Sequence, residues 1–144
     1  LISIYCAKQN AVVTASDISA IAIENIKLNA LSNNVSINII KSDLFDEIPK
    51  QGFDFVIINP PYFPKDPKNE SESAWFCGSD FHYFKKLFSQ LSNYKTSNSI
   101  VLMILSEDCD VSRIKSIAEE NNFNFSLVFQ KKVLWEENFI YRID

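Results

Sequence analysis

Residues 59–62, Asn-Pro-Pro-Tyr, could do chemistry because they join a strand-like apolar run to a rigid polar turn. The run 53–58 ends at Asn59, and the two prolines after it fix the backbone and forbid a helix. A carboxamide oxygen and a nearby carbonyl, such as that of Pro60, can together accept both hydrogens of a planar –NH2 group. Tyr62 would offer a ring face to a flat substrate. An ordinary proline turn would have the same sequence, so the surrounding elements must decide.

The composition fits one globular domain, since 47% of the 144 residues are hydrophobic. The net charge of -4 argues against strong nonspecific binding to phosphates. Three widely spaced cysteines, Cys6, Cys77 and Cys109, form no Cys-x-x-Cys or Cys/His cluster. This argues against a metal site or a disulfide scaffold and favours a reducing, cytoplasmic compartment. No apolar stretch reaches the length of about 18 residues that predicts a membrane span.

Strand and helix patterns alternate along the chain. Helices are expected to end near Asn10, to run from a Ser19 cap to Leu31, and to cover 80–91 and 110–121. The expected core stripe of the helix over 80–91 is Phe84, Leu87, Phe88 and Leu91. This alternation predicts an α/β fold with a mostly parallel sheet and helices on both faces. Glu136-Glu137 are expected to separate the last two strands as an antiparallel hairpin. The expected strands are 11–16, 35–41, 53–58, 99–105, 123–134 and 138–143.

Polar residues follow three successive strands of this expected sheet. They are Asp17, Asp43 and Asn59. Because ligands of such sheets bind at the carboxyl ends of parallel strands, these residues are candidates for one site. Asp17 could instead cap the helix that follows it, and the two roles are compatible. The longest loop-like segment, 63–79, is expected to cover the pocket.

Three stretches together carry a family resemblance: 15–19 (Ala-Ser-Asp-Ile-Ser), 41–45 (Lys-Ser-Asp-Leu-Phe) and 54–62, which ends in Asn-Pro-Pro-Tyr. Their order and spacing resemble the class I S-adenosylmethionine-dependent methyltransferases, and more narrowly those with an Asn-Pro-Pro-Tyr motif. The resemblance covers nearly the whole chain and implies a single Rossmann-like catalytic domain over 1–144. The first strand and glycine-rich loop of that family should precede Leu1. We therefore expect an N-terminally incomplete chain, with a gap in the sheet where that strand belongs.

The resemblance also implies how the cofactor, S-adenosylmethionine, is held. Asp17 would accept hydrogen bonds from the ribose hydroxyls, and Asp43 from the adenine amino group. The backbone N–H of Leu44 would donate to the adenine ring. Ile18 and Phe45 would lie on its two faces, although either could equally be ordinary core. The expected cofactor-binding set is Asp17, Ile18, Asp43, Leu44, Phe45 and Asn59.

The expected catalytic residues are Asn59, Pro60 and Tyr62. An amide or aniline-type nitrogen is a poor nucleophile because its lone pair is delocalised. Accepting both of its hydrogens would draw the lone pair out of conjugation and aim it at the sulfonium methyl group. No general base is required before this attack. His82, the only histidine, is therefore expected to be structural.

Two acceptors remain open for such an enzyme. One is a protein glutamine side chain, as in the enzymes that modify translation release factors; the other is an adenine or guanine amine in RNA or DNA. Residues 74–80 and the helix after them resemble the glutamine enzymes, and the acidic charge agrees, so we favour a protein partner. A non-catalytic partner subunit with a decayed methyltransferase fold is an alternative of another class. A nicotinamide-dependent oxidoreductase ranks last because it would not explain Asn-Pro-Pro-Tyr.

Overall fold

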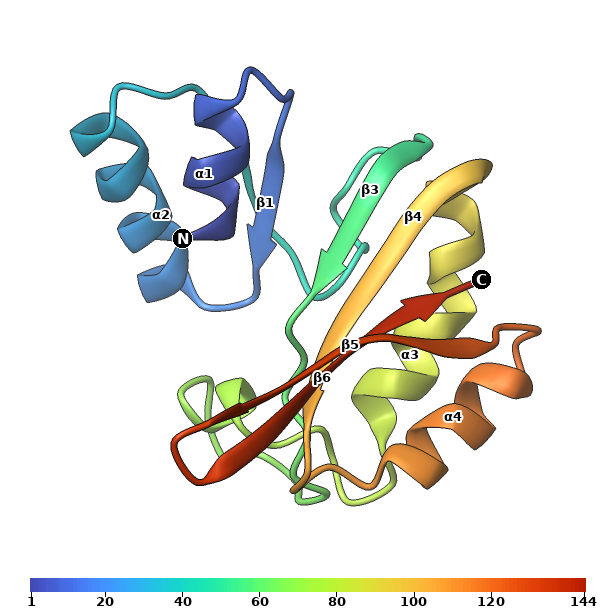
Figure 1. The fold of residues 1–144 in the computed structure, drawn as a ribbon. Helices are drawn as coiled ribbons and strands as arrows, with labels where there is room; N and C mark the ends of the chain where they lie inside the picture. Colours follow the sequence, from blue (N-terminus) through green and yellow to red (C-terminus); the bar gives the residue numbers. More distant parts are fainter. The chain divides into compact units, whose positions relative to one another are not determined.

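The computed structural model describes all 144 residues, which form two compact units, Leu1–Pro49 and Lys50–Asp144 (Figure 1). Each unit has its own sheet. None of the helices combines the length and the apolar character that a bilayer crossing requires. No group of His, Cys, Asp and Glu side chains is arranged to hold a metal ion.

The first unit is a parallel strand pair with two helices. Ser19 caps the second helix, because its Oγ accepts the backbone N–H of Ala22 at 3.4 Å. This helix connects the two strands, which run parallel with Asp17 opposite Lys41. The elements are α1 (Ile2–Lys8), β1 (Thr14–Asp17), α2 (Ala20–Ser32) and β2 (Asn38–Lys41).

Both strands of this unit are shorter than the predicted ranges 11–16 and 35–41. The β-branched residues at the start of each range lie in the connections from the preceding helices. Val12, for example, is 94% exposed and contributes nothing to the core. β-propensity alone therefore placed the beginnings of the strands too early, whereas their carboxyl ends were predicted within one residue.

The second unit contains a four-stranded sheet in the order β3-β4-β6-β5. β3 is parallel to β4, and β6 is antiparallel to both β4 and β5. The predicted closing hairpin is confirmed. The elements are β3 (Phe53–Ile58), η1 (Glu72–Ala74), α3 (His82–Leu91), η2 (Ser92–Tyr94), β4 (Lys95–Ser106), α4 (Val111–Glu119), β5 (Phe125–Val133) and β6 (Glu136–Ile143).

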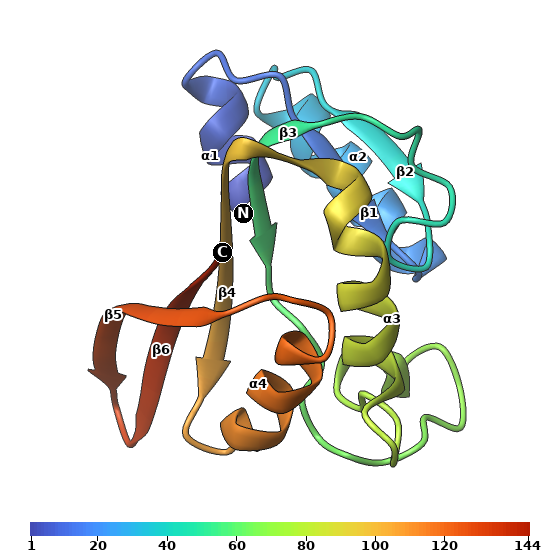
Figure 2. The same cartoon turned by 90° about the vertical axis from the view of Figure 1, so that its right-hand side faces the viewer.

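α3 and α4 pack on one face of this sheet and bury its core (Figure 2). Val101, Met103 and Leu105 alternate along β4 and are buried, as a strand with one covered face requires. Each such side chain contributes roughly 1.5–3 kcal/mol when fully buried. The predicted stripe of α3 is buried as well. The helix residues of this core are Phe84, Leu87, Phe88, Leu91, Ile114, Ile117 and Ala118.

The predicted hairpin turn at Glu136-Glu137 is wrong. Leu134 and Trp135 form the turn, and Leu134 has a left-handed backbone with φ 57°. Both glutamates belong to β6, where Glu137 stands opposite Lys132 and can attract it across the strands. Leu134 and Trp135 are apolar and carry no turn signal in the sequence. The turn was therefore predicted at the charged pair Glu136-Glu137 instead.

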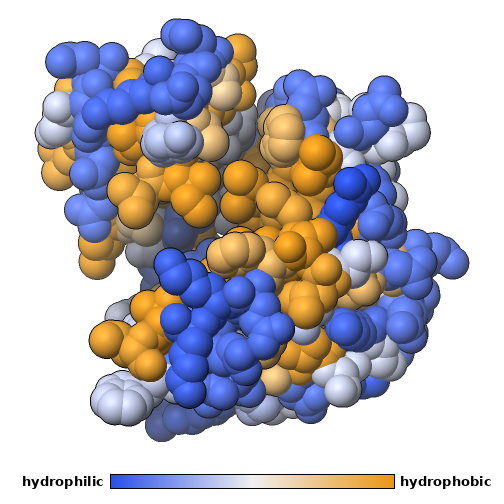
Figure 3. All heavy atoms as spheres, viewed as in Figure 1, coloured by the Kyte–Doolittle hydropathy of each residue, from blue (hydrophilic) through white to orange (hydrophobic).

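The strands divide between two sheets, so β1 pairs with β2 and β3 pairs with β4, but β1 and β3 do not pair. The sheet face of the second unit that α3 and α4 leave uncovered is apolar: Phe55, Ile57 and Ile104 are exposed there. Figure 3 shows hydrophobic side chains at the surface over β3 and β4.

Phe88→Ala is expected to lower the free energy of unfolding by about 3–5 kcal/mol, since it leaves a cavity in a closed aromatic cluster. Phe88 is buried, and its ring centroid lies 5.9 Å from that of Phe123 and 6.0 Å from that of Phe125. The matched control is Phe129→Ala on exposed β5, which should change stability by less than about 1 kcal/mol. Urea unfolding of both variants gives the measurement. Equal losses would show that the core is not where we place it.

Candidate functional site

The two predicted cofactor acids lie at the same edge of the first unit. β1 and β2 run parallel, so their carboxyl ends meet there, with Asp17 closing β1 and Asp43 two residues beyond β2. The backbone carbonyl of Asp17 accepts the N–H of Ser42 at 3.0 Å, which ties the two ends together. The Asp17 carboxylate is half-buried, and its Oδ1 accepts the N–H of Ser19 at 2.8 Å. That bond orients the carboxylate and also supports the start of α2.

A sharp bend follows Asp43. Leu44 has a left-handed backbone with φ 55°, so the chain turns at once after the exposed carboxylate. The carbonyl of Phe45 then accepts the N–H of Ile48 at 3.0 Å, and the Phe45 ring is buried at 8% exposure. Ile18, by contrast, is 41% exposed. Of the two residues expected to hold an adenine ring, one therefore belongs to the core of the unit and the other is accessible.

The chemistry of these groups fits the cofactor that the sequence resemblance implies. Ribose hydroxyls and the adenine amino group are hydrogen-bond donors, and carboxylates are acceptors with several sites each. Asp17 and Asp43 place two carboxylates at one strand edge, and Ile18 adds an accessible apolar side chain. These acceptors and this apolar side chain therefore suit a nucleoside.

The predicted catalytic residues lie in the second unit, directly after β3. Asn59 is exposed, and its carboxamide makes no hydrogen bond within the chain. Pro60 is buried and Tyr62 is half-buried, so two residues of the motif pack against the rest of the unit. The ring centroids of Tyr62 and Phe63 are 4.8 Å apart in a tilted arrangement. The carboxamide is thus available to an outside ligand on a backbone that proline and packing hold in place.

The structure brings Asp17 and Asp43 together in the first unit, and Asn59, Pro60 and Tyr62 together in the second. Their union in one site stays a prediction. Their roles toward cofactor and substrate are likewise predictions that rest on residue chemistry and on the position of each group at a strand end.

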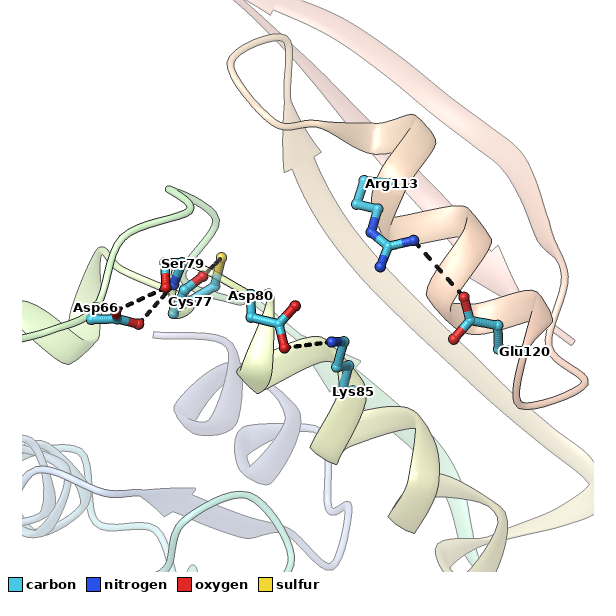
Figure 4. A network of polar contacts seen from close by, with 8 residues as sticks. Asp66, Cys77, Ser79, Asp80, Lys85, Arg113 and Glu120 are labelled. Atoms are coloured by element: carbon cyan, nitrogen blue, oxygen red, sulfur yellow. Dashed lines mark hydrogen bonds and ion pairs between the residues drawn. The ribbon is translucent and has the colours of Figure 1, made fainter.

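Sequence reasoning missed a polar clamp in the loop after the motif. The Asp66 carboxylate accepts the N–H of Ser79 at 2.8 Å through Oδ1 and its hydroxyl at 2.8 Å through Oδ2 (Figure 4). These bonds hold the pKa of Asp66 below its ordinary value, because both stabilise the charged carboxylate. The carbonyl of Lys65 also accepts the N–H of Gly78 at 3.0 Å. The acid between two prolines was the only signal of this clamp in the sequence.

The start of α3 follows the clamp directly. Gly78 has φ 87°, and a Cβ there would stand 3.0 Å from the Cβ of His82, so glycine suits the position. Asp80 pairs with Lys85 at 2.6 Å, and that hydrogen bond lowers the pKa of Asp80 (Figure 4). His82 is the exposed first residue of the helix.

The two cysteines of the second unit have shielded thiols. Cys77 is buried, and its Sγ donates to the carbonyl of Phe63 at 3.3 Å. Burial raises the pKa of the Cys77 thiol to about 11 and also raises that of Cys109. Neither thiol is therefore suited to act as a nucleophile near neutral pH.

Asp66→Ala is expected to make residues 63–79 sensitive to limited proteolysis at pH 7, because both clamp bonds to Ser79 are lost. Lys68→Ala in the same loop is the control and should stay as resistant as the unchanged protein. In the unchanged protein the clamp needs a charged Asp66, whose pKa is lowered from 3.8. Its contribution should be complete between pH 5 and 8 and should disappear only as the pH falls through that lowered value. Equal cleavage of all three proteins would contradict the clamp.

Comparison with known proteins places these observations in a family. The family model of the methyltransferase small domain matches residues 1–75. A protein N5-glutamine methyltransferase of Methanocaldococcus jannaschii is 31% identical over 95% of this chain and 72% of its own length. The ribosomal protein uL3 glutamine methyltransferase of Francisella tularensis is 33% identical over 66% of the chain and 34% of its own length. The release factor glutamine methyltransferase of Lactococcus lactis is 31% identical over 71% of the chain and 41% of its own length.

Solved structures agree on the fold. A methyltransferase from Pyrococcus furiosus has a TM-score of 0.67 at 20% identity and covers 92% of this chain and 63% of its own. An S-adenosylmethionine-dependent methyltransferase from Bacteroides fragilis was solved in complex with S-adenosylhomocysteine. It has a TM-score of 0.63 at 15% identity and covers 95% of this chain and 64% of its own. These likenesses confirm the predicted class of fold, Rossmann-like with an antiparallel hairpin. The chain spans less than two thirds of each of these two structures.

Proposed function

Because this chain belongs to the methyltransferase small domain family, we propose that it forms the catalytic part of an N-methyltransferase acting on a protein glutamine side chain. The family and the S-adenosylhomocysteine complex of the Bacteroides fragilis protein indicate S-adenosylmethionine as the cofactor. When bound, the cofactor supplies an electrophilic methyl group on a sulfonium that is an excellent leaving group. The observation that carries the proposal is the exposed, unpaired carboxamide of Asn59 at the end of β3.

Asn59 would act by holding and orienting the acceptor nitrogen. Its carboxamide oxygen accepts one hydrogen of the –NH2 group, and the carbonyl of Pro60 accepts the other. Both bonds favour a nitrogen whose lone pair has left conjugation with its own carbonyl. The cofactor would supply the methyl group: as the nitrogen bonded to the methyl carbon, the carbon–sulfur bond would break and its electrons would leave with S-adenosylhomocysteine. The nitrogen would then release its surplus proton to solvent. Positioning supplies most of the rate in this scheme, so no acid–base pair is needed.

The first unit would hold the cofactor. Asp17 would accept from the ribose hydroxyls and Asp43 from the adenine amino group, with the Leu44 N–H donating to the ring. Ile18, which is accessible, would cover one face of the adenine, whereas Phe45 lies in the core of the unit. A carboxylate that is already oriented by the Ser19 N–H loses little freedom on binding, which favours affinity.

Glutamine is preferred to a nucleic-acid base for two reasons. The three relatives compared above carry the name glutamine methyltransferase, two of them for a release factor and a ribosomal protein. The chain is also acidic, with a net charge of -4, which disfavours contact with many phosphates. A translation release factor and ribosomal protein uL3 are therefore the first acceptors to test.

Asn59→Ala is expected to reduce kcat about 100-fold or more, because the acceptor nitrogen is no longer aligned. Affinity for S-adenosylhomocysteine should change little. The assay follows transfer of a radiolabelled methyl group to release factor and uL3, using the full-length protein. Asn93→Ala, another exposed asparagine of the second unit, should keep full activity. An Asn59→Ala variant with unchanged turnover would refute this mechanism.

Asp17→Asn is expected to weaken S-adenosylhomocysteine binding about 10-fold or more, since hydrogen bonds to a charged group are worth about 1.5–3 kcal/mol. The amide oxygen can still accept the Ser19 N–H, so stability should be nearly unchanged. Calorimetric titration measures the affinity, and Asp108→Ala is the exposed acidic control. Tight binding by Asp17→Asn would leave Asp17 as a helix-capping residue. No binding by the unchanged full-length protein would favour a non-catalytic partner subunit.

A further inference from the structure

Trp75 is a large apolar side chain that an ordered loop keeps at the surface. Its side chain is 60% exposed. Its backbone is fully engaged, because the N–H donates to the carbonyl of Glu72 at 3.0 Å and the carbonyl accepts the N–H of Phe63 at 3.1 Å. The residue therefore has a fixed backbone and a free indole.

The two residues after Trp75 are less exposed than Trp75 itself. Phe76 is half-buried, with the Lys65 ammonium 4.6 Å from its ring centroid, and Cys77 is buried. The Phe63 carbonyl accepts the Cys77 N–H at 2.9 Å, which extends the bridge between the two arms of the loop. With the Asp66 clamp, these contacts order the loop without burying its largest apolar side chain. Such a pre-organised aromatic loses little entropy when a partner covers it, as in the anchor residues of protein interfaces.

The position of Trp75 links it to the proposed chemistry. Its carbonyl accepts the N–H of Phe63, which directly follows the 59–62 motif and whose ring lies tilted against that of Tyr62. An acceptor chain whose side-chain nitrogen reaches Asn59 would therefore pass the loop that presents Trp75. Both residues belong to the second unit.

The net charge of the loop favours a peptide partner over a nucleic acid. Residues 63–79 carry two lysines against three carboxylates, a net charge of -1, and Asp80 after them is paired with Lys85. A nucleic-acid strand would meet net repulsion here, although a base could stack on an indole. A peptide without excess negative charge does not meet this repulsion.

We propose that Trp75 is the contact residue for the protein acceptor and covers an uncharged or basic peptide segment beside the target glutamine. This assignment rests on the proposed function. It adds a specificity-determining residue outside the Asn-Pro-Pro-Tyr motif. The acceptor segment would bury the indole, while Asn59 holds the glutamine nitrogen.

The test compares Trp75→Ala with Trp135→Ala in the full-length protein. Trp135 is the other tryptophan, lies 90% exposed in the hairpin turn and has no part in the proposed site. Methyl transfer to release factor and to uL3 is measured over a range of acceptor concentrations, with total tRNA as a third acceptor. Trp75→Ala should raise the KM for the protein acceptor about 10-fold or more, with kcat at saturation and S-adenosylhomocysteine affinity nearly unchanged. Trp75→Phe should recover part of the loss, and Trp135→Ala should match the unchanged protein.

The outcomes separate this inference from the proposed function. If the unchanged protein methylates a protein acceptor and Trp75→Ala has the same KM as Trp135→Ala, the assignment of Trp75 is overturned and the function stands. If the unchanged protein methylates tRNA and neither protein, both are overturned. A fall in S-adenosylhomocysteine affinity equal to the change in KM would show that Trp75 only supports the fold.

Discussion

The second unit depends on the pairing and packing of β4. This strand is hydrogen-bonded on one edge to β3 and on the other to β6, and its alternate residues are buried under α3 and α4. A slip of one residue would exchange Val101 and Met103 for Leu102 and Ile104 beneath the helices, so the register is strongly specified. Because Ile58 lies opposite Met103, that register also determines where β3 ends. The position of Asn59 is thus a consequence of core packing on the neighbouring strand.

The loop after Asn59 combines rigidity with exposure. Two prolines restrict the motif itself, and the hydrogen bonds of Phe63, Asp66 and Ser79 close the segment behind it. A long loop without such bonds would have to lose its conformational freedom when substrate arrives, which weakens binding. Here much of that ordering has already occurred in folding. The rigid backbone leaves Asn59 and Trp75 accessible, which is the arrangement a binding surface needs.

The chemistry assigned to this chain is divided between carboxylates and an amide. Carboxylates suit the cofactor because its ribose and adenine groups donate hydrogen bonds. An amide suits the methyl acceptor because its oxygen accepts a hydrogen bond from the –NH2 group without taking the proton. Cys77 and Cys109 contribute to packing, and burial raises the pKa of both thiols. Catalysis by positioning depends more on backbone geometry than on acid–base groups.

The sequence by itself determined the order and type of the elements, the buried stripe of α3, and the place of Asp17, Asp43 and Asn59 at or just beyond the carboxyl ends of their strands. These features follow from local periodicity, capping and proline, which act over a few residues. Only the tertiary structure decided the turn at Leu134 and Trp135 and the clamp between Asp66 and Ser79. It also decided which aromatic side chains of the loop stay exposed. Those features arise from contacts between residues far apart in the chain, where side-chain packing and cross-loop hydrogen bonds outweigh local propensity.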